Sequence, residues 1–266
     1  LYKVFGKHER EVIERLKAGE SREDLASLGT AAVIDVSLEV AKGETFVVMG
    51  LSGSGKSTLI RMINGLWAPS EGTVEVAGKV VSDMSDSQLR ELRRDHVSMV
   101  FQHFALLPHL TVRENAAYGL KLQGKLKPKD RLEKADEWLR TVGLNGWGGK
   151  YPRQLSGGMQ QRVGLARALA AETDILLMDE AFSALDPLIR REMQDQLLEL
   201  QGTLNKTIIF ITHDLNEAMY LGDHIAVMRN GRVAQIGTSD EILTQPADDY
   251  VADFVQDVDR SRVLTA

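Results

Sequence analysis

The sequence contains no cysteine among its 266 residues. This absence excludes disulfide bonds and any zinc site built on cysteine, and it suits a reducing compartment such as the cytosol. Six histidines are present, and they are scattered without the spacing of a metal-ligand motif. We therefore expect a chain whose fold depends on its hydrophobic core, arranged as one compact domain with smaller lobes.

Long hydrophobic runs are also missing. The longest ones, such as Ile175 to Met178 and Ile208 to Ile211, fall far short of the ~20 residues that a membrane-spanning helix requires. Residues Leu1 to Phe5 lack the apolar core of a signal peptide. The net charge of -6 argues against broad binding to nucleic acid, whose partners usually carry a basic face. We expect any membrane span to come from a partner.

Four short apolar runs are each followed directly by chemically distinctive residues. The runs are Thr45 to Met49, Val97 to Phe101, Ile175 to Met178 and Thr207 to Ile211. Such runs, separated by helical patterns, indicate buried parallel strands. Ligands bind beyond the carboxyl ends of parallel strands. The sequence therefore predicts that four groups face one crevice: Gly50 to Ser57, Gln102, Asp179 with Glu180, and His213.

Other patterns predict the elements around this sheet. Val33 to Val40 alternates like a half-buried antiparallel strand, and Thr73 to Val76 with Val80 and Val81 would extend it. A helical pattern predicts a helical subdomain at about 103–171 that ends in the helix Met159 to Ala171. Apolar residues at helical spacing predict a helix from Ile189 to Leu204 with a buried stripe, and Asn230-Gly231 predicts a hairpin turn.

Residues 8–30, called the insertion below, do not fit a minimal domain built on the predicted sheet. The pattern predicts two short helices, the second opened by a capping box at Ser21 to Asp24. Val12, Leu16, Leu25 and Leu28 would pack the insertion onto the core. It is interpreted as a solvated decoration, and the alternative is a contact for a partner or a regulator.

The segment Gly50 to Ser57 has the pattern G-x-x-x-x-G-K-S after an apolar run and before a helix. Its backbone amides would cradle a phosphate at the helix N-terminus. Lys56 would place a positive charge at the β- and γ-phosphates, and the Ser57 hydroxyl would be a ligand of Mg²⁺. The predicted nucleotide contacts here are Gly50, Ser52, Gly53, Ser54, Gly55, Lys56, Ser57 and Thr58.

Four further residues carry the predicted hydrolytic chemistry. Asp179 ends an apolar run in the Walker-B pattern and would hold Mg²⁺, while Glu180 would polarise the attacking water. His213 would donate to the γ-phosphate, although a histidine there could merely begin a helix. Gln102 would meet both Mg²⁺ and the water, although glutamine is also an ordinary residue at a strand end.

A second phosphate-binding element, Gln154 to Arg162, lies far downstream. Ser156 offers a hydroxyl, and Gly157 and Gly158 would let backbone amides approach a phosphate without a clashing Cβ. The following helix, expected from Met159, would add its positive end. Taken alone, Ser-Gly-Gly could be an ordinary loop. This element makes most sense when it covers nucleotide that another copy of the chain holds.

Together these motifs resemble those of the ATP-binding-cassette ATPases. The resemblance rests on the P-loop, Gln102, the signature Leu155 to Gln160, Asp179 with Glu180, Ser183 to Asp186, and His213. It implies an α/β P-loop NTPase cassette over 1–266, with a RecA-like parallel-sheet core, a small antiparallel β subdomain and an α-helical subdomain. It also implies binding of ATP and Mg²⁺.

The same resemblance implies a head-to-tail homodimer. Ser156, Gly157, Gly158 and Gln160 of one copy would close over ATP on Lys56 of the other, with Asp186 at the seam. The family stacks an aromatic residue on adenine, usually in a Lys-x-aromatic-Gly setting. Phe5 in Lys3 to Gly6 fits this setting, and Tyr2 is the lesser candidate.

Within the family, the chain is similar to the ATPases of glycine betaine and proline betaine importers. This similarity rests on Met49 to Thr58, Asp179 to Arg190 and the insertion. It implies a subunit at the cytoplasmic face of the membrane that drives a permease and works indirectly with an extracytoplasmic solute-binding protein. Such ATPases often continue into paired sensing domains, whereas this sequence ends at Ala266, so we interpret it as a short or shortened form.

Two alternatives remain open. ATPases of polyamine, sulfate or amino-acid importers would have the same catalytic residues. A soluble cassette protein acting on nucleic acid is expected to show a second cassette, a long heptad insertion or a basic face, and the sequence shows none of these.

Overall fold

The computed structural model of the chain describes residues 1–256. Backbone contacts divide the chain into two compact units. Among the described residues, the first consists of Leu1–Ala41, Thr45–Leu89 and 211–256, and the second consists of Lys42–Glu44 and Arg90–Phe210. Residues 257–266, which the sequence analysis included in the cassette, lie outside the described residues.

The core of the first unit contains β3 (Thr45–Met49), β9 (His224–Arg229) and β10 (Arg232–Gly237). β3 pairs in parallel with β9, and β9 pairs antiparallel with β10. All five residues of β3 are buried, as expected for a strand made only of apolar residues and threonine. Asn230 and Gly231 have φ angles of 50° and 83°, which is the geometry of the predicted two-residue hairpin.

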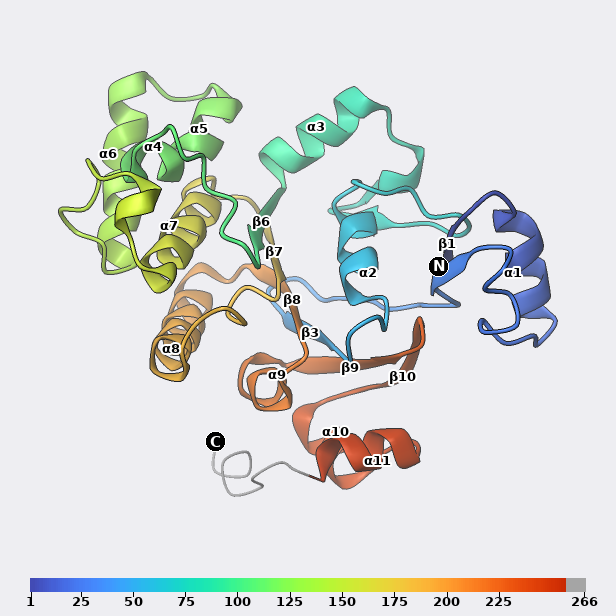
Figure 1. Cartoon of the computed structure of the whole chain (residues 1–266). Helices are drawn as coiled ribbons and strands as arrows, with labels where there is room; N and C mark the ends of the chain where they lie inside the picture. The colour runs from blue at the N-terminus through green and yellow to red at the C-terminus, as the bar shows by residue number, and fades with distance from the viewer. Residues whose placement is uncertain (257–266) are drawn as a thin grey trace. The chain divides into compact units, whose positions relative to one another are not determined.

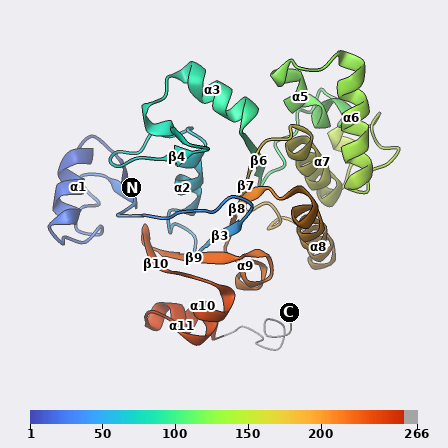
Figure 2. The same ribbon diagram turned by 180° about the vertical axis from the view of Figure 1, so that it is seen from behind.

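Helices surround these strands. α2 (Lys56–Ile63) follows β3, and α9 (Leu215–Leu221) packs on β3. Beyond β10 the chain forms α10 (Ser239–Thr244) and α11 (Asp249–Val255), with α10 against β10 (Figure 2).

The prediction of a strand from Val33 to Val40 is wrong. β2 (Thr30–Val33) pairs antiparallel with β1 (Lys3–Phe5) and ends at Val33. Asp35 then has a φ of 52°, which takes the backbone out of the extended conformation. The alternation still reports burial correctly, because Ile34 and Val36 are each only 1% exposed.

The second small sheet is also separate from the first, contrary to expectation. β4 (Glu75–Val76) pairs only with β5 (Lys79–Val80) in the described part of the chain, and a 3₁₀ turn, Val81–Asp83, follows. Two antiparallel pairs of strands therefore replace the single small sheet that the sequence suggested.

The insertion contains one helix rather than two. α1 (Glu9–Lys17) forms as predicted, but residues 22–28 form turns. The Asp24 N–H donates to Ser21 Oγ at 3.1 Å, as the predicted capping box requires, and the Ser21 hydroxyl donates to the Asp24 carboxylate at 2.6 Å. The backbone bonds that follow are nevertheless mainly of the short turn type, such as Leu28 N–H to Leu25 O at 2.9 Å. The insertion nevertheless packs as expected. Its apolar cluster consists of Val4, Val12, Ile13, Leu16, Leu25, Ala31 and Ile34.

The second unit is built on β6 (Val97–Phe101) and β7 (Ile175–Asp179), which pair in parallel with Phe101 opposite Asp179. α3 (Asp86–Asp95) leads into this unit, and β8 (Thr207–Thr212) leads out of it. All four predicted parallel-type strands are thus present within one residue of their expected bounds.

The segment 103–171 contains four helices that pack on one another (Figure 1). They are α4 (Val112–Ala116), α5 (Tyr118–Gln123), α6 (Pro128–Thr141) and α7 (Gly157–Ala170), with a 3₁₀ turn at Pro152–Gln154. α7 begins two residues before the expected start. α8 (Pro187–Leu204) follows β7, and Met193 and Leu197 of its predicted stripe are buried.

Candidate functional site

The loop between β3 and α2 is tightly fitted to its neighbours at two glycines. Gly50 has a φ of 146°, and a Cβ there would lie 2.2 Å from the carbonyl oxygen of Met228. Gly55 has a φ of 102°, and its Cβ would lie 2.2 Å from the carbonyl oxygen of Ala32. Gly53, by contrast, has open space at its Cβ position and a φ of 77°. Two glycines therefore fix the loop, and the third leaves room for an approaching ligand.

Hydrogen bonds hold this loop in shape. The Ser54 N–H donates to Leu51 O at 3.2 Å, and the Gly231 N–H of the β9–β10 turn donates to Ser54 O at 3.0 Å. Lys56 is only 4% exposed, and its Nζ donates to Gly50 O at 2.7 Å and to Leu51 O at 3.1 Å. The loop is therefore preformed, with an ammonium group enclosed by its carbonyls.

The start of α2 suits an anion. Its first turn contains no acidic residue, and its N-cap Gly55 offers no side chain that could satisfy the free amides. The amides, the positive end of the helix and Lys56 together favour a bound negative charge. Ser57 and Thr58 lie in this first turn, and Ser52 is exposed in the loop. Ser54 differs: its hydroxyl is enclosed and has no hydrogen-bond partner within residues 1–256.

Phe5 is the more exposed of the two candidate aromatic residues. It ends β1, its exposed fraction is 36%, and its ring lies 5.0 Å from that of Trp67 in an edge-to-face arrangement. The guanidinium of Arg61, in α2, stacks 4.8 Å over the Trp67 ring. Tyr2 instead packs on the apolar cluster of the insertion, with Lys17 Nζ 5.4 Å over its ring. No sequence motif marks Trp67, because its contact with Phe5 depends on the tertiary fold.

His213 is exposed directly after β8. The next residue, Asp214, caps α9, since its carboxylate accepts the N–H groups of Asn216 at 2.9 Å and Glu217 at 3.3 Å. The helix start therefore depends on Asp214 and not on His213.

In the second unit, Gln102 and Glu180 come together. They follow β6 and β7, whose last residues are neighbours. The Gln102 Nε2 donates to Glu180 Oε2 at 3.4 Å and to Ser183 Oγ at 3.2 Å. Asp179, at the end of β7, is 9% exposed. An amide and two carboxyl groups thus gather where parallel strands end, as ligand-binding groups do in open α/β sheets.

The loop after β7 holds Glu180 in an unusual conformation. Glu180 has a φ of 47°, which is uncommon for a residue other than glycine and costs on the order of 1–3 kcal/mol. The Ser183 hydroxyl donates to Glu180 O at 2.9 Å. Arg190 donates to the carbonyl oxygens of Phe182, Ser183 and Leu185 at 3.1–3.3 Å. Ser183 and Arg190 therefore position the loop, a role that the sequence alone did not assign to them.

The two glycines of the downstream element have different environments. Ser156 is the N-cap of α7 and accepts the Met159 N–H at 3.4 Å. A Cβ at Gly158 would lie 2.7 Å from Ile189 Cγ2, so Gly158 lets α7 approach α8. A Cβ at Gly157 would meet only Phe104 Cζ at 3.5 Å, an ordinary contact. Packing inside the chain therefore requires Gly158 but not Gly157.

The remaining predicted contacts of this unit have local roles as well. Gln160 Nε2 donates to Leu155 O at 3.2 Å, which closes the signature onto α7. Asp186 is the N-cap of α8 and accepts the Ile189 N–H at 3.1 Å, while the residue itself stays exposed. Within residues 1–256, no group of three or more histidine, cysteine or acidic side chains is placed to hold a metal ion. No helix in this part of the chain is long and apolar enough to cross a membrane.

A buried strand that runs into a glycine-rich loop, with an enclosed lysine at the start of a helix, defines a P-loop nucleotide-binding protein. The model of the ABC transporter family matches residues 33–183. The chain therefore belongs to the ABC transporter family, as an ATP-binding cassette.

Curated relatives place the chain more narrowly. It is 56% identical to the glycine betaine transport ATP-binding protein OpuAA of Bacillus subtilis, over 99% of this chain and 63% of that protein. It is 54% identical to the glycine betaine/proline betaine transport system ATP-binding protein ProV of Escherichia coli, over 100% of this chain and 67% of that protein. The chain thus spans about two thirds of the length of these relatives.

A solved structure supports the fold. The ATP-binding cassette MJ0796, in a dimeric post-hydrolysis state bound to ADP and Pi, matches with a TM-score of 0.77 and 33% sequence identity. The match covers 90% of this chain and 96% of that one. The predicted α/β cassette fold is confirmed.

Proposed function

We propose that this chain is the ATP-hydrolysing subunit of an importer that takes up compatible solutes of the glycine betaine and proline betaine type. The observation that carries the proposal is the preformed loop with the enclosed Lys56. The names of OpuAA and ProV support the solute class. The solute itself does not touch this chain, so the class rests on similarity alone.

ATP binding follows from the geometry of the first unit. The phosphates lie on the loop and on the first turn of α2, where the open space at Gly53 admits them. Lys56 Nζ exchanges its two carbonyl partners for phosphate oxygens, which are stronger acceptors. Phe5 stacks on adenine, a contact that contributes about 1–3 kcal/mol in comparable base–aromatic pairs.

The residues present also fit Mg²⁺, which prefers oxygen ligands. Ser57 supplies a hydroxyl, Asp179 a carboxylate that is mostly enclosed, and Gln102 an amide whose Nε2 is already engaged, so that Oε1 is the oxygen offered to the metal. When bound, the ion would neutralise charge on the phosphates.

Hydrolysis requires a group that accepts a proton from water, and Glu180 is that group in this proposal. Gln102 holds the Glu180 carboxylate, and the backbone of Glu180 itself is strained. His213, exposed beyond β8, orients the water and donates to the γ-phosphate. The three residues divide the work: Glu180 takes the proton, while Gln102 and His213 position the reacting atoms.

Two copies cooperate in this proposal. Ser156, Gly157, Gly158 and Gln160 of one copy cover ATP on Lys56 of the other, with Asp186 at the seam. The dimeric form of the related cassette MJ0796 supports this assembly. So does the exposure of Gly157, which has no packing need inside its own chain.

The partners follow from the transporter assignment. The dimer sits at the cytoplasmic face of the membrane and drives a permease, which receives solute from an extracytoplasmic binding protein. Nucleic acid is not a partner, in keeping with the net charge of -6. Importer ATPases for polyamines, sulfate or amino acids are the alternative, because their catalytic groups are the same.

Reconstitution with the partner permease tests the function. ATP hydrolysis by the complex in vesicles is measured with the solute-binding protein and either glycine betaine, a polyamine, sulfate or an amino acid, and a Lys56→Ala variant is the matched control. Stimulation by glycine betaine alone, absent in the variant, supports the proposal. Stimulation by another solute supports the alternative, and tight binding of a polynucleotide would contradict transport altogether.

A further inference from the structure

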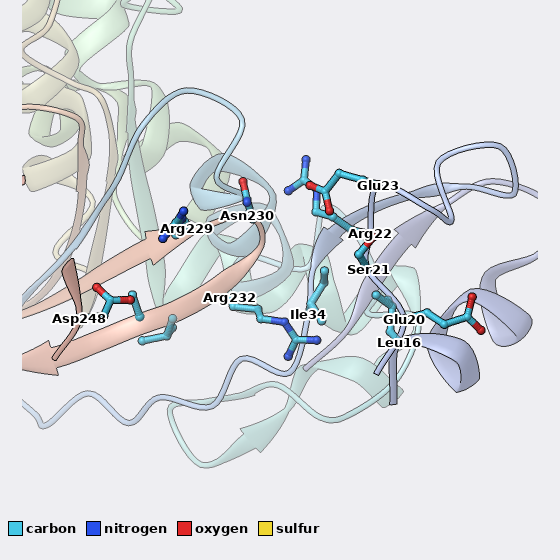
Figure 3. A pocket seen from close by; sticks show the side chains of 12 residues that line it. Leu16, Glu20, Ser21, Arg22, Glu23, Ile34, Arg229, Asn230, Arg232 and Asp248 are labelled. Atoms are coloured by element: carbon cyan, nitrogen blue, oxygen red, sulfur yellow. The ribbon is translucent and has the colours of Figure 1, made fainter. Parts of the chain in front are cut away.

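A cavity of about 380 Å³ lies between the insertion and the β9–β10 hairpin, inside the first unit (Figure 3). Ser21 and Arg22 line it from the insertion, and Arg229, Asn230 and Arg232 line it from the hairpin. None of these residues belongs to the nucleotide site proposed above. The cavity is thus a separate feature, and its size is within the range of small-molecule sites.

Three arginines around the cavity have few partners. Within residues 1–256, neither Arg229 nor Arg232 forms an ion pair with a carboxylate. Arg22 Nε lies 3.7 Å from Glu23, whose side chain is 66% exposed. Arg22 Nη1 is enclosed and has no hydrogen-bond partner in the same part of the chain. An enclosed donor without a partner costs free energy, which an added acceptor recovers.

The acidic residues of the cavity, in contrast, are already engaged. Glu20 accepts two bonds from Arg15, at 2.9 and 2.7 Å. Asp248 accepts the Val251 N–H at 2.8 Å and so caps α11. Glu23, the third acidic residue of the lining, lies 3.7 Å from Arg22 Nε and is 66% exposed. Arg229 and Arg232 therefore keep donors to spare, and the cavity favours an anion.

The remaining wall of the cavity is apolar. Leu16 of α1, Ile34 after β2, and Val233 of β10 form it. Leu16 and Ile34 are already buried, so the apolar surface open to a ligand is that of the half-buried Val233 and Ala234. A small organic anion covers this surface and also meets the arginines.

We propose that this cavity binds a small organic phosphate monoester, with the phosphate on the arginines and the organic part on the apolar wall. Guanidinium groups match phosphate oxygens in pairs of hydrogen bonds, which makes arginine the preferred residue for such recognition. The cavity therefore gives the insertion a role in ligand binding, where the sequence suggested a decoration.

Occupancy of the cavity is coupled to the phosphate loop. Asn230 and Arg232 flank Gly231, whose N–H donates to Ser54 O in that loop at 3.0 Å. The guanidinium of Arg229 stacks 4.6 Å over the ring of Tyr250. Burial raises the pKa of Tyr250, while a hydrogen bond with the Leu51 backbone in the same loop opposes that shift. A ligand that fixes the hairpin turn thus changes the affinity of the loop for nucleotide, and this consequence rests on the proposed function.

Calorimetry on the full chain without nucleotide tests the site, with phenyl phosphate as the probe and phenol as its uncharged counterpart. We expect phenyl phosphate to bind and phenol not to bind. Arg232→Gln should weaken binding about 10-fold or more, since a charge-assisted hydrogen bond is lost. Arg232 is exposed, so this variant folds normally. Arg10→Gln, at an exposed position of α1, is the matched control and should leave binding unchanged.

A Lys56→Ala variant separates this site from the phosphate loop. Binding that survives Lys56→Ala but not Arg232→Gln supports the cavity. Absence of binding, or loss in Lys56→Ala with retention in Arg232→Gln, would overturn it. For the coupling, the affinity for ATP is measured with and without phenyl phosphate. A change of a few-fold in the wild-type chain and none in Arg232→Gln is expected, and an unchanged affinity in both would overturn the coupling. Because the first measurement needs no nucleotide, it stays decisive even if the chain fails to hydrolyse ATP.

Discussion

The two glycines of the signature provide a sharp test of the dimer, because the chain itself needs only one of them. In Gly157→Ala the new methyl group meets Phe104 Cζ at 3.5 Å, whereas in Gly158→Ala it would lie 2.7 Å from Ile189 Cγ2. Neither glycine has a positive φ, so alanine causes no backbone strain at either position. The two variants thus add the same group to neighbouring residues of one helical turn.

The expected losses of stability differ accordingly. Gly158→Ala overpacks the contact between α7 and α8 and should lower the free energy of unfolding by about 1–3 kcal/mol. For a chain of this size that corresponds to a fall in Tm of roughly 2–12 °C. Gly157→Ala should change the free energy of unfolding by less than about 0.5 kcal/mol, as surface substitutions usually do. Urea denaturation and thermal unfolding of the two variants measure this difference.

ATP hydrolysis, in contrast, should depend strongly on Gly157. If the Gly157 backbone of one copy touches the phosphates held by the other, a bulkier Gly157→Val should abolish most ATP hydrolysis while the protein remains folded. Hydrolysis is measured over a range of protein concentrations, since a dimer gives a rate per chain that rises with concentration. Full activity of folded Gly157→Val, with a rate per chain that does not depend on concentration, would refute the shared site.

Three further predictions concern other groups. Glu180→Gln should slow ATP hydrolysis about 10²- to 10⁴-fold and leave ATP binding intact, and a wild-type turnover number in steady-state assays would disprove its role as the base. Trp67→Ala should weaken ATP binding roughly 2- to 10-fold, because it removes the edge-to-face contact that supports the Phe5 ring. Trp67→Phe should restore the affinity, as measured by nucleotide titration. Equal affinities for all three proteins would contradict a role of this contact in ATP binding. The hydrogen bond from Arg94 lowers the pKa of Asp95 to about 2. The ionised Asp95 carboxylate therefore stabilises the fold above pH ~4, and this stabilisation is lost as the pH falls toward 2. In urea denaturation, the free energy of unfolding of Asp95→Asn should depend less on pH in that window than that of the wild-type chain.

The sequence predicted the strands of the core well because each of them is a short, uninterrupted apolar run before a distinctive residue. Alternation was a poorer guide. Ile34 and Val36 are buried like residues of a strand, but their N–H groups bond to two unrelated partners, Gly231 O and Leu1 O. A period of two reports which side chains face the core, and it does not report whether a continuous ladder forms.

The candidate site shows the same limit. Motifs identified Gly157 and Gly158 together as residues that would admit a phosphate, yet the structure shows that Gly158 is also required by Ile189, which lies in another helix. Likewise the capping signal at Ser21 was correct in its side-chain bonds and wrong in predicting a helix, because the helix depends on the backbone bonds that follow. Contacts between residues distant in sequence leave no local pattern, so Trp67 and the three arginines of the cavity could not be found.

The turn at Asn230-Gly231 has a consequence for the ageing of the protein. An asparagine before glycine loses its amide when the glycine nitrogen attacks the side-chain carbonyl, and here the N–H of that nitrogen is bonded to Ser54 O. Spontaneous deamidation at Asn230 should therefore be slow while the P-loop is closed on the hairpin and should accelerate whenever the two separate. Its extent, followed by mass spectrometry in stored protein with and without ATP, becomes a chemical record of how often that separation occurs.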